Sequence, residues 1–170
     1  LLDMDFDGYA IGGLSVGEKH SEMIDIVKFT SNYLPIVKPR YLMGVGRPID
    51  IFKSVERGID MFDCVLPTRF GRNGRAFTKE SELNLKNSKF SNDNRPLDNN
   101  LKCFVSKEFS RAYIHHLTKT NELLSWMILS LHNVAFYQKM MSDIRKSIKN
   151  KNYKKVMQSY LETQRIYEKT

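Results

Sequence analysis

Asp63 is the side chain in this sequence with the clearest chemical potential. It stands at the end of a short apolar run, and the segment that follows carries Arg69, Arg72 and Arg75. A carboxylate can act as a covalent nucleophile, and the planar fork of arginine suits phosphate. We expect a basic loop here, and the pattern predicts attack on a substrate attached to phosphate. The alternative is a strand-end acid that caps a turn beside surface arginines.

Strands and helices alternate in the part of the chain that leads to Asp63. Strand-like runs occupy Phe6–Ile11, Tyr41–Val45 and Ile59–Leu66, and apolar residues recur at helical spacing in Glu18–Tyr33 and Ile49–Arg57. This order predicts parallel βαβ units, which place their sites at the carboxyl ends of the strands. Three parallel strands also leave an open edge, which predicts a partner or a further part of the sheet.

The second part of the chain is more polar and then helical. A small hairpin is expected at Phe77 and Leu83–Leu85. Helices are expected over Ser110–Leu117, from an N-cap at Thr120 onward, and over Tyr153–Tyr167. The residues expected to line the core side of the long middle helix are Leu124, Met127, Ile128, Leu131, Ala135, Met141, Ile144 and Ile148.

Composition limits the classes of protein that fit. The chain has 170 residues, with 27 Lys plus Arg against 19 Asp plus Glu, a net charge of +8. This surplus favours an anionic partner, nucleic acid first, and the alternative is a solvated basic face. Two cysteines are too few for a disulfide framework. We find no apolar run of ~18 residues, which predicts a cytoplasmic protein with no membrane partner.

Four blocks of sequence resemble the tRNA-guanine transglycosylase (queuine tRNA-ribosyltransferase) family. They read GYAIGGLSVGE (8–18), PRYLMGVG (39–46), DMFDCVLPTRFGRNG (60–74), and SRAYIHHL with HNVAFY (110–117 and 132–137). The resemblance implies an α/β fold, the C-terminal part of a (β/α)₈ TIM barrel with about its last three strands. A degenerate zinc subdomain and C-terminal helices would follow. Residues 1–74 would be the barrel segment that carries the nucleophile, and residues 75–170 the zinc region and helices.

The resemblance also implies an activity, the exchange of the anticodon wobble guanine of tRNA for queuine or a 7-deazaguanine precursor. The acid that matches Asp63 is the family's nucleophile, which forms a covalent bond with the ribose as guanine leaves. A second displacement by the incoming base would retain the configuration, as in retaining glycosidases. The alternative is a catalytically dead remnant or a tRNA-binding scaffold.

Further site residues are carried over from the same blocks. The base would be bound by Gly12, Gly13, Leu14, Tyr41 and Met43. RNA would be contacted by Gly44, Val45, Gly46, Arg47, Pro48, Ile49, Asp50, Thr68, Arg69, Phe70, Gly71 and Arg72. Glycines let the main chain approach a flat ring closely. For the base-binding set, ordinary strand-end packing is the alternative.

The chain departs from the family at the metal site. The family pattern is Cys-x-Cys-x-x-Cys followed by a His on a later helix, and the matching positions here are Leu101, Cys103, Ser106 and His132. Structural zinc takes four nitrogen or sulfur ligands. Only the half-site Cys103 and His132 is left, so we expect the family's zinc to be lost or weakly bound.

The second departure concerns the N-terminal side. The chain opens on Leu1, and the resemblance leaves the first five or so barrel strands unmatched. In the family that part supplies a second aspartate and most groups that read the base edge. We therefore expect the chain to be incomplete alone, with an N-terminal half or a homodimer partner besides tRNA and the base.

Overall fold

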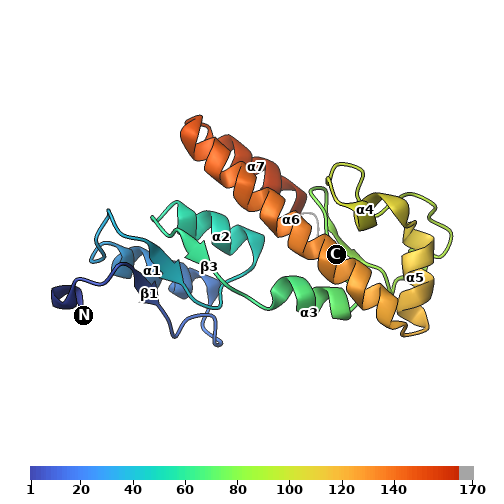
Figure 1. Ribbon diagram of the computed structural model, residues 1–170, viewed down its shortest axis with the longest axis horizontal. Helices are drawn as coiled ribbons and strands as arrows, with labels where there is room; N and C mark the ends of the chain where they lie inside the picture. The colour runs from blue at the N-terminus through green and yellow to red at the C-terminus, as the bar shows by residue number, and fades with distance from the viewer. Residues whose placement is uncertain (165–170) are drawn as a thin grey trace. The chain divides into compact units, whose positions relative to one another are not determined.

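The computed structural model describes residues 1–164, which form two compact units divided between Val65 and Leu66 (Figure 1). The division lies ahead of the boundary expected after residue 74, because the helix that begins at Leu66 packs within the second unit. The functional division into residues 1–74 and 75–170 stays a prediction.

The first unit is a three-stranded parallel sheet with two crossover helices. Its elements in chain order are the 3-10 helix η1 (Leu2–Met4), β1 (Tyr9–Ile11), α1 (His20–Ser31), β2 (Arg40–Leu42), α2 (Pro48–Val55) and β3 (Met61–Phe62). The strand order is β1-β2-β3, with Ala10 opposite Tyr41 and Tyr41 opposite Met61. The predicted βαβ units are confirmed, although each strand is shorter than its apolar run, because the chain turns away at the glycines and at Asp63. Membership of a closed barrel stays a prediction.

Burial of apolar side chains holds α1 on this sheet. Val27 and Leu42 are fully buried, and Ile24, Val45 and Ile59 pack with them in one cluster. Pro48 stands at the first turn of α2, where its missing N–H costs nothing. The sheet and its helices therefore form a rigid base under the carboxyl ends of the strands.

The second unit is built around one long helix. Its elements are α3 (Leu66–Arg72), β4 (Arg75–Phe77), β5 (Glu82–Asn84), the 3-10 helix η2 (Ser88–Phe90), α4 (Phe104–Glu108), α5 (Arg111–Lys119), α6 (Leu123–Lys149) and α7 (Tyr153–Gln164). The predicted hairpin is confirmed as the antiparallel pair β4–β5. Helices α3 and α7 both contact α6 (Figure 1). The last part of the helix expected over Tyr153–Tyr167 lies outside the described residues.

The segment after Pro67 is a helix and not a loop, so that expectation was wrong. Proline pre-organises the first turn of a helix, and Leu66–Arg72 forms α3. A side-chain carbon on Gly71 would lie 2.6 Å from the amide nitrogen of Ser130. The absence of that carbon lets α3 approach α6 closely, which fixes the helix.

Two expectations about α6 were also wrong. Thr120 ends α5, where its hydroxyl donates to the His116 carbonyl, and the N-cap of α6 is Glu122. Of the predicted core stripe, only Ile128 and Ile144 are buried, whereas Leu124, Met127, Leu131 and Ile148 are exposed. The buried face is made by Ser125, Ile128, Leu129, His132, Asn133, Phe136, Tyr137, Met140, Ile144 and Ser147.

Asn133 connects α6 to the segment from α3 to β4. Its side-chain amide donates to the carbonyls of Pro67 at 2.9 Å and Arg75 at 3.0 Å, and its side-chain oxygen accepts from the Phe77 amide at 2.9 Å. Asn133 is fully buried. Because Asn133 is buried, water does not compete for these three hydrogen bonds.

We predict that Asn133→Ala lowers the free energy of unfolding of the second unit by about 2–4 kcal/mol, because it leaves buried backbone groups unpaired. Urea unfolding followed by circular dichroism measures this. Gln138→Ala, at an exposed position of the same helix, should change the free energy by less than ~0.5 kcal/mol. Equal effects of the two substitutions would contradict the assignment.

Candidate functional site

The carboxyl ends of three parallel strands meet at one edge of the sheet in the first unit. Gly12 follows β1, Met43 follows β2 and Asp63 follows β3 directly. Such edges are where open α/β sheets bind ligands. The parallel register thus brings together the Gly12–Leu14 turn, Tyr41, Met43 and Asp63, residues that are far apart in the sequence.

Two hydrogen bonds fix the Asp63 carboxylate. The Tyr41 hydroxyl donates to Asp63 Oδ1 at 2.6 Å, and the Gly44 amide donates to the same oxygen at 2.9 Å. Gly44 has a φ of 75°, a left-handed conformation that a residue with a side chain rarely adopts. The glycine is therefore what allows the main chain after β2 to turn its amide toward Asp63.

These hydrogen bonds determine the protonation of Asp63 and Tyr41. The Tyr41 hydroxyl, and then the Gly44 amide, hold the pKa of Asp63 below its ordinary value. The same hydrogen bond to Asp63 raises the pKa of Tyr41. Asp63 is exposed. Near neutral pH the site therefore presents an accessible, oriented carboxylate beside a protonated phenol.

The turn after β1 lies next to the Met43 side chain. A side-chain carbon on Gly12 would lie 3.2 Å from Met43 Sδ, and the Met43 amide donates to the Ile11 carbonyl at 3.0 Å. Gly13 has a φ of 75°, and open space lies where a side-chain carbon would stand. The arrangement leaves a bare main-chain surface at Gly12–Gly13 beside a partly exposed thioether, which suits contact with a flat ring.

Glu18 belongs to this site, although no role was predicted for it from the sequence. Its carboxylate accepts from the amides of Ser15 and Val16, the latter at 3.0 Å, and these bonds lower the pKa of Glu18. The signal available in the sequence was an acid five residues after Gly13, the second glycine of the turn. Glu18 positions the turn that follows Leu14, which is itself buried.

The predicted RNA-contacting residues divide by exposure. In the stretch Gly44–Asp50, Val45, Gly46, Pro48 and Asp50 are buried, Ile49 is partly buried, and Arg47 is the exposed cation. Asp50 lies 2.7 Å from His20 Nδ1, and burial raises the pKa of Asp50 despite that neighbour. No pattern in the sequence predicted this His20–Asp50 pair.

In the stretch Thr68–Arg72, Arg69 and Arg72 are exposed on α3. Gly71 packs against α6, and the Phe70 ring stacks on Phe77 with centroids 5.1 Å apart. Thr68 is partly buried. Packing within the second unit accounts for Phe70 and Gly71, so the two arginines are the exposed charged residues of this stretch.

The half-site Cys103 and His132 belongs to the second unit. His132 is fully buried, Cys103 is partly buried, and burial lowers the pKa of His132. Across residues 1–164, no group of three or more His, Cys, Asp or Glu side chains is placed to hold a metal ion. None of the helices in the described part of the chain combines the length and hydrophobicity that a bilayer crossing requires.

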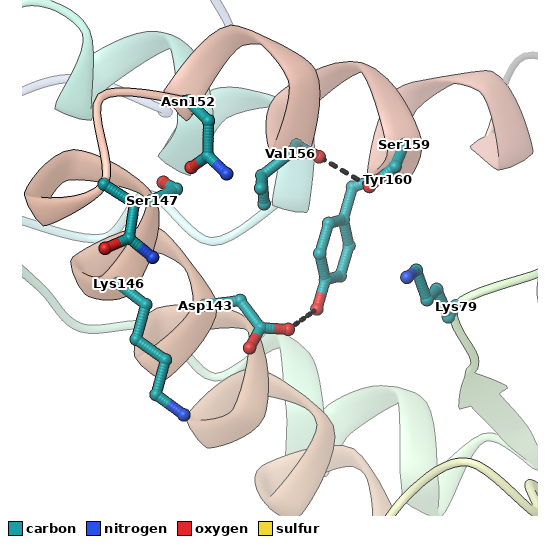
Figure 2. Close-up of a pocket in the computed structure, with 9 residues that line it drawn as sticks. Lys79, Asp143, Lys146, Ser147, Asn152, Val156, Ser159 and Tyr160 are labelled. Carbon is teal, nitrogen blue, oxygen red and sulfur yellow. Dashed lines mark hydrogen bonds between the residues drawn. The ribbon is translucent and has the colours of Figure 1, made fainter.

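A shallow pocket of about 170 Å³ lies beside the turn between α6 and α7 and holds none of the predicted site residues (Figure 2). The Tyr160 hydroxyl donates to Asp143 at 2.9 Å, and Lys139 pairs with the same carboxylate at 2.6 Å. Burial raises the pKa of Tyr160. The carboxylate in this pocket is thus already paired, and we assign the pocket no part in the chemistry.

We predict that Tyr41→Phe raises the pKa of Asp63, because the largest cause of its lowered value is then removed. A ¹³C NMR titration of the carboxyl groups measures the change. Tyr33→Phe is the control, since Tyr33 is an exposed tyrosine of the same unit. An unchanged Asp63 pKa in Tyr41→Phe would contradict the assignment.

The lowered pKa of Asp63 makes the stability of the folded state depend on pH. Because folding lowers the pKa of Asp63, its hydrogen bonds stabilise the folded state above the ordinary carboxyl value of ~3.9. That contribution is lost as the pH falls through the lowered pKa. At acid pH, the free energy of unfolding should therefore fall less steeply with decreasing pH in Tyr41→Phe than in the wild type.

Comparison with known proteins matches nearly the whole chain. A family model described as queuine tRNA-ribosyltransferase matches residues 1–166. A queuine tRNA-ribosyltransferase of Zymomonas mobilis is 52% identical over 160 residues, which are 94% of this chain and 42% of that protein. The Rickettsia rickettsii protein of the same name is 52% identical over 149 residues, 88% of this chain and 41% of the relative.

A third relative, from Agrobacterium fabrum, carries the same name and is 55% identical over 148 residues, 87% of this chain and 39% of its own length. The chain thus spans about two fifths of the length of these curated relatives.

Proposed function

This chain belongs to the queuine tRNA-ribosyltransferase family, and on that premise we propose that it supplies the nucleophile side of a site that exchanges guanine in tRNA. The observation that carries the proposal is the exposed Asp63 carboxylate, held by Tyr41 and Gly44 beside the Gly12–Gly13 turn. A fixed, ionised carboxylate at the edge of a guanine-binding turn is what a displacement at a ribose carbon requires.

The proposed reaction has two displacements. Asp63 Oδ2 attacks C1′ of the ribose, the C1′–N9 bond breaks, and its electron pair leaves with guanine, which takes up a proton. The incoming queuine or 7-deazaguanine precursor loses a proton as its nitrogen attacks C1′, and the Asp63–ribose bond breaks. Configuration at C1′ is retained because it inverts twice. The target nucleotide must leave its stack to reach Asp63, at a cost of a few kcal/mol.

Other residues of the chain have supporting roles in this proposal. Met43 and the main chain at Gly12–Leu14 contact the base, and Glu18 holds the turn that follows. Tyr41 positions Asp63 and keeps it ionised. Arg47, Arg69 and Arg72 are exposed cations that would bind phosphates of the tRNA backbone. The acid that protonates the leaving guanine would come from a part that corresponds to the portion of the relatives not covered by this chain.

We expect base exchange only when the chain is combined with the remaining part of the Zymomonas mobilis relative. Incorporation of labelled guanine into tRNA measures the exchange. Asp63→Asn should reduce the rate by at least roughly 10³-fold and abolish the covalent tRNA adduct on a denaturing gel. Asp25→Asn, an exposed acid on α1, is the matched control and should leave the rate unchanged. Exchange by Asp63→Asn at the wild-type rate would contradict the proposal.

Measurements of tRNA binding distinguish a catalytic role from a scaffold role. The 27 basic against 19 acidic residues also support a scaffold role. Arg69→Ala and Arg72→Ala should each weaken tRNA binding and reduce the slope of log K against log salt by about 1. Arg145→Ala, an exposed arginine on α6, is the control. If tRNA binding survives Asp63→Asn while no combination of parts exchanges guanine, the chain is a binding scaffold.

A further inference from the structure

The loop that leads into α4 is folded by its own backbone. The Cys103 amide donates to the Leu101 carbonyl at 2.8 Å, and the Ser106 amide donates to the Cys103 carbonyl at 3.2 Å. The Asp98 amide closes the loop by donating to the Ser106 carbonyl at 3.0 Å. These backbone bonds bring positions 101, 103 and 106 together.

Ser106 joins this loop to α6 through His132. The Ser106 hydroxyl lies 2.8 Å from His132 Nδ1, and His132 Nε2 lies 2.7 Å from the Phe77 carbonyl oxygen. A carbonyl oxygen only accepts, so Nε2 carries the ring proton and Nδ1 accepts from the serine hydroxyl. Both ring nitrogens are therefore engaged, and three segments that are far apart in the sequence meet at one side chain.

A zinc ion does not fit this arrangement. Of the four positions that match the family's ligands, Leu101 is a buried apolar residue and Ser106 carries no thiol. His132 has no ring lone pair left for a metal, since Nδ1 accepts from Ser106 and Nε2 is protonated. Cys103 alone cannot supply the four nitrogen or sulfur ligands of a structural zinc site.

We propose that the hydrogen-bonded chain from Ser106 through His132 to Phe77 replaces the metal, and that the second unit folds without zinc. The serine hydroxyl occupies a ligand position and pins the loop to α6, while the Phe77 carbonyl ties the same histidine to β4. This inference concerns how the second unit is held together. It is independent of the base exchange proposed above.

Catalysis is the other use of a serine–histidine pair, and burial argues against it. Ser106 and His132 have no exposed surface, and neither lines the pocket beside α7. A nucleophilic serine must reach its substrate. A buried pair in which both histidine ring nitrogens are engaged acts in structure.

The first test uses the wild-type chain produced in zinc-supplemented medium. Metal analysis by mass spectrometry should find far less than one zinc per chain, and EDTA should leave the thermal unfolding midpoint unchanged. Stoichiometric zinc with a midpoint that falls in EDTA would overturn the proposal. This test does not depend on whether any variant folds.

The second test removes the hydroxyl. Ser106→Ala leaves His132 Nδ1 buried without a donor, which should lower the unfolding midpoint by roughly 5–10 °C. Ser125→Ala is the matched control, because Ser125 is equally buried. The Ser125 hydroxyl donates to the Glu122 carbonyl, but that carbonyl also accepts from the Ser125 amide at 3.1 Å, so it keeps a donor when the hydroxyl is removed. Equal midpoints for the two variants would overturn the role of Ser106.

The third test restores the ligand set. Leu101→Cys combined with Ser106→Cys gives thiols at positions 101, 103 and 106, the last of which contacts His132. This double variant should bind one zinc and gain an unfolding midpoint that falls in EDTA. Failure of the double variant to bind zinc would overturn the assignment of Leu101 and Ser106 to ligand positions. Asp63 lies in the other unit, so these results are separate from those of the exchange assay.

Discussion

The parallel pairing of β2 with β3 is the constraint on which the candidate site depends. Tyr41 lies opposite Met61, so the chain beyond β2 runs beside the residue that ends β3, and Asp63 meets both the Tyr41 hydroxyl and the Gly44 amide. A shift of one residue would turn the Tyr41 side chain to the other face of the sheet. The buried cluster under the sheet, with Val27 and Leu42 at its centre, prevents that shift.

In the second unit, a polar loop and a short hairpin are held against one helix. Adjacent residues of α6 do this with buried hydrogen bonds, His132 to the loop and hairpin, and Asn133 to the hairpin and α3. Buried polar groups of this kind cost stability unless every partner is present. Here each partner is a specific backbone or hydroxyl group, so the network specifies one arrangement of the segments rather than adding bulk hydrophobic energy.

Much of the first unit could be predicted from the sequence because strands, glycine turns and the acid at a strand end leave local signals. The alternation of strands and helices predicted the parallel βαβ units, but not the hydrogen bond between Tyr41 and Asp63, because Tyr41 was expected at the start of its strand. What the sequence could not supply were contacts made at a distance. Gly71 looked like a loop residue because its neighbour Ser130 is far along the chain, and the core face of α6 was misjudged because Leu124 and Leu131 are apolar yet exposed. The hydroxyl of Ser106 gave no signal of a buried histidine partner.

The long sequence separation of these buried bonds has a consequence for synthesis on the ribosome. Phe77 and Ser106 emerge 55 and 26 residues ahead of His132, the side chain that joins them. A nascent chain that has not yet reached α6 can form its hairpin, but it has nothing to bury the hairpin against, and contacts of this range are slow to close. The ribosome must synthesise α6 before the second unit can fold cooperatively. Pauses before α6 is complete would therefore prolong the exposure of the unfolded segments to proteases and chaperones.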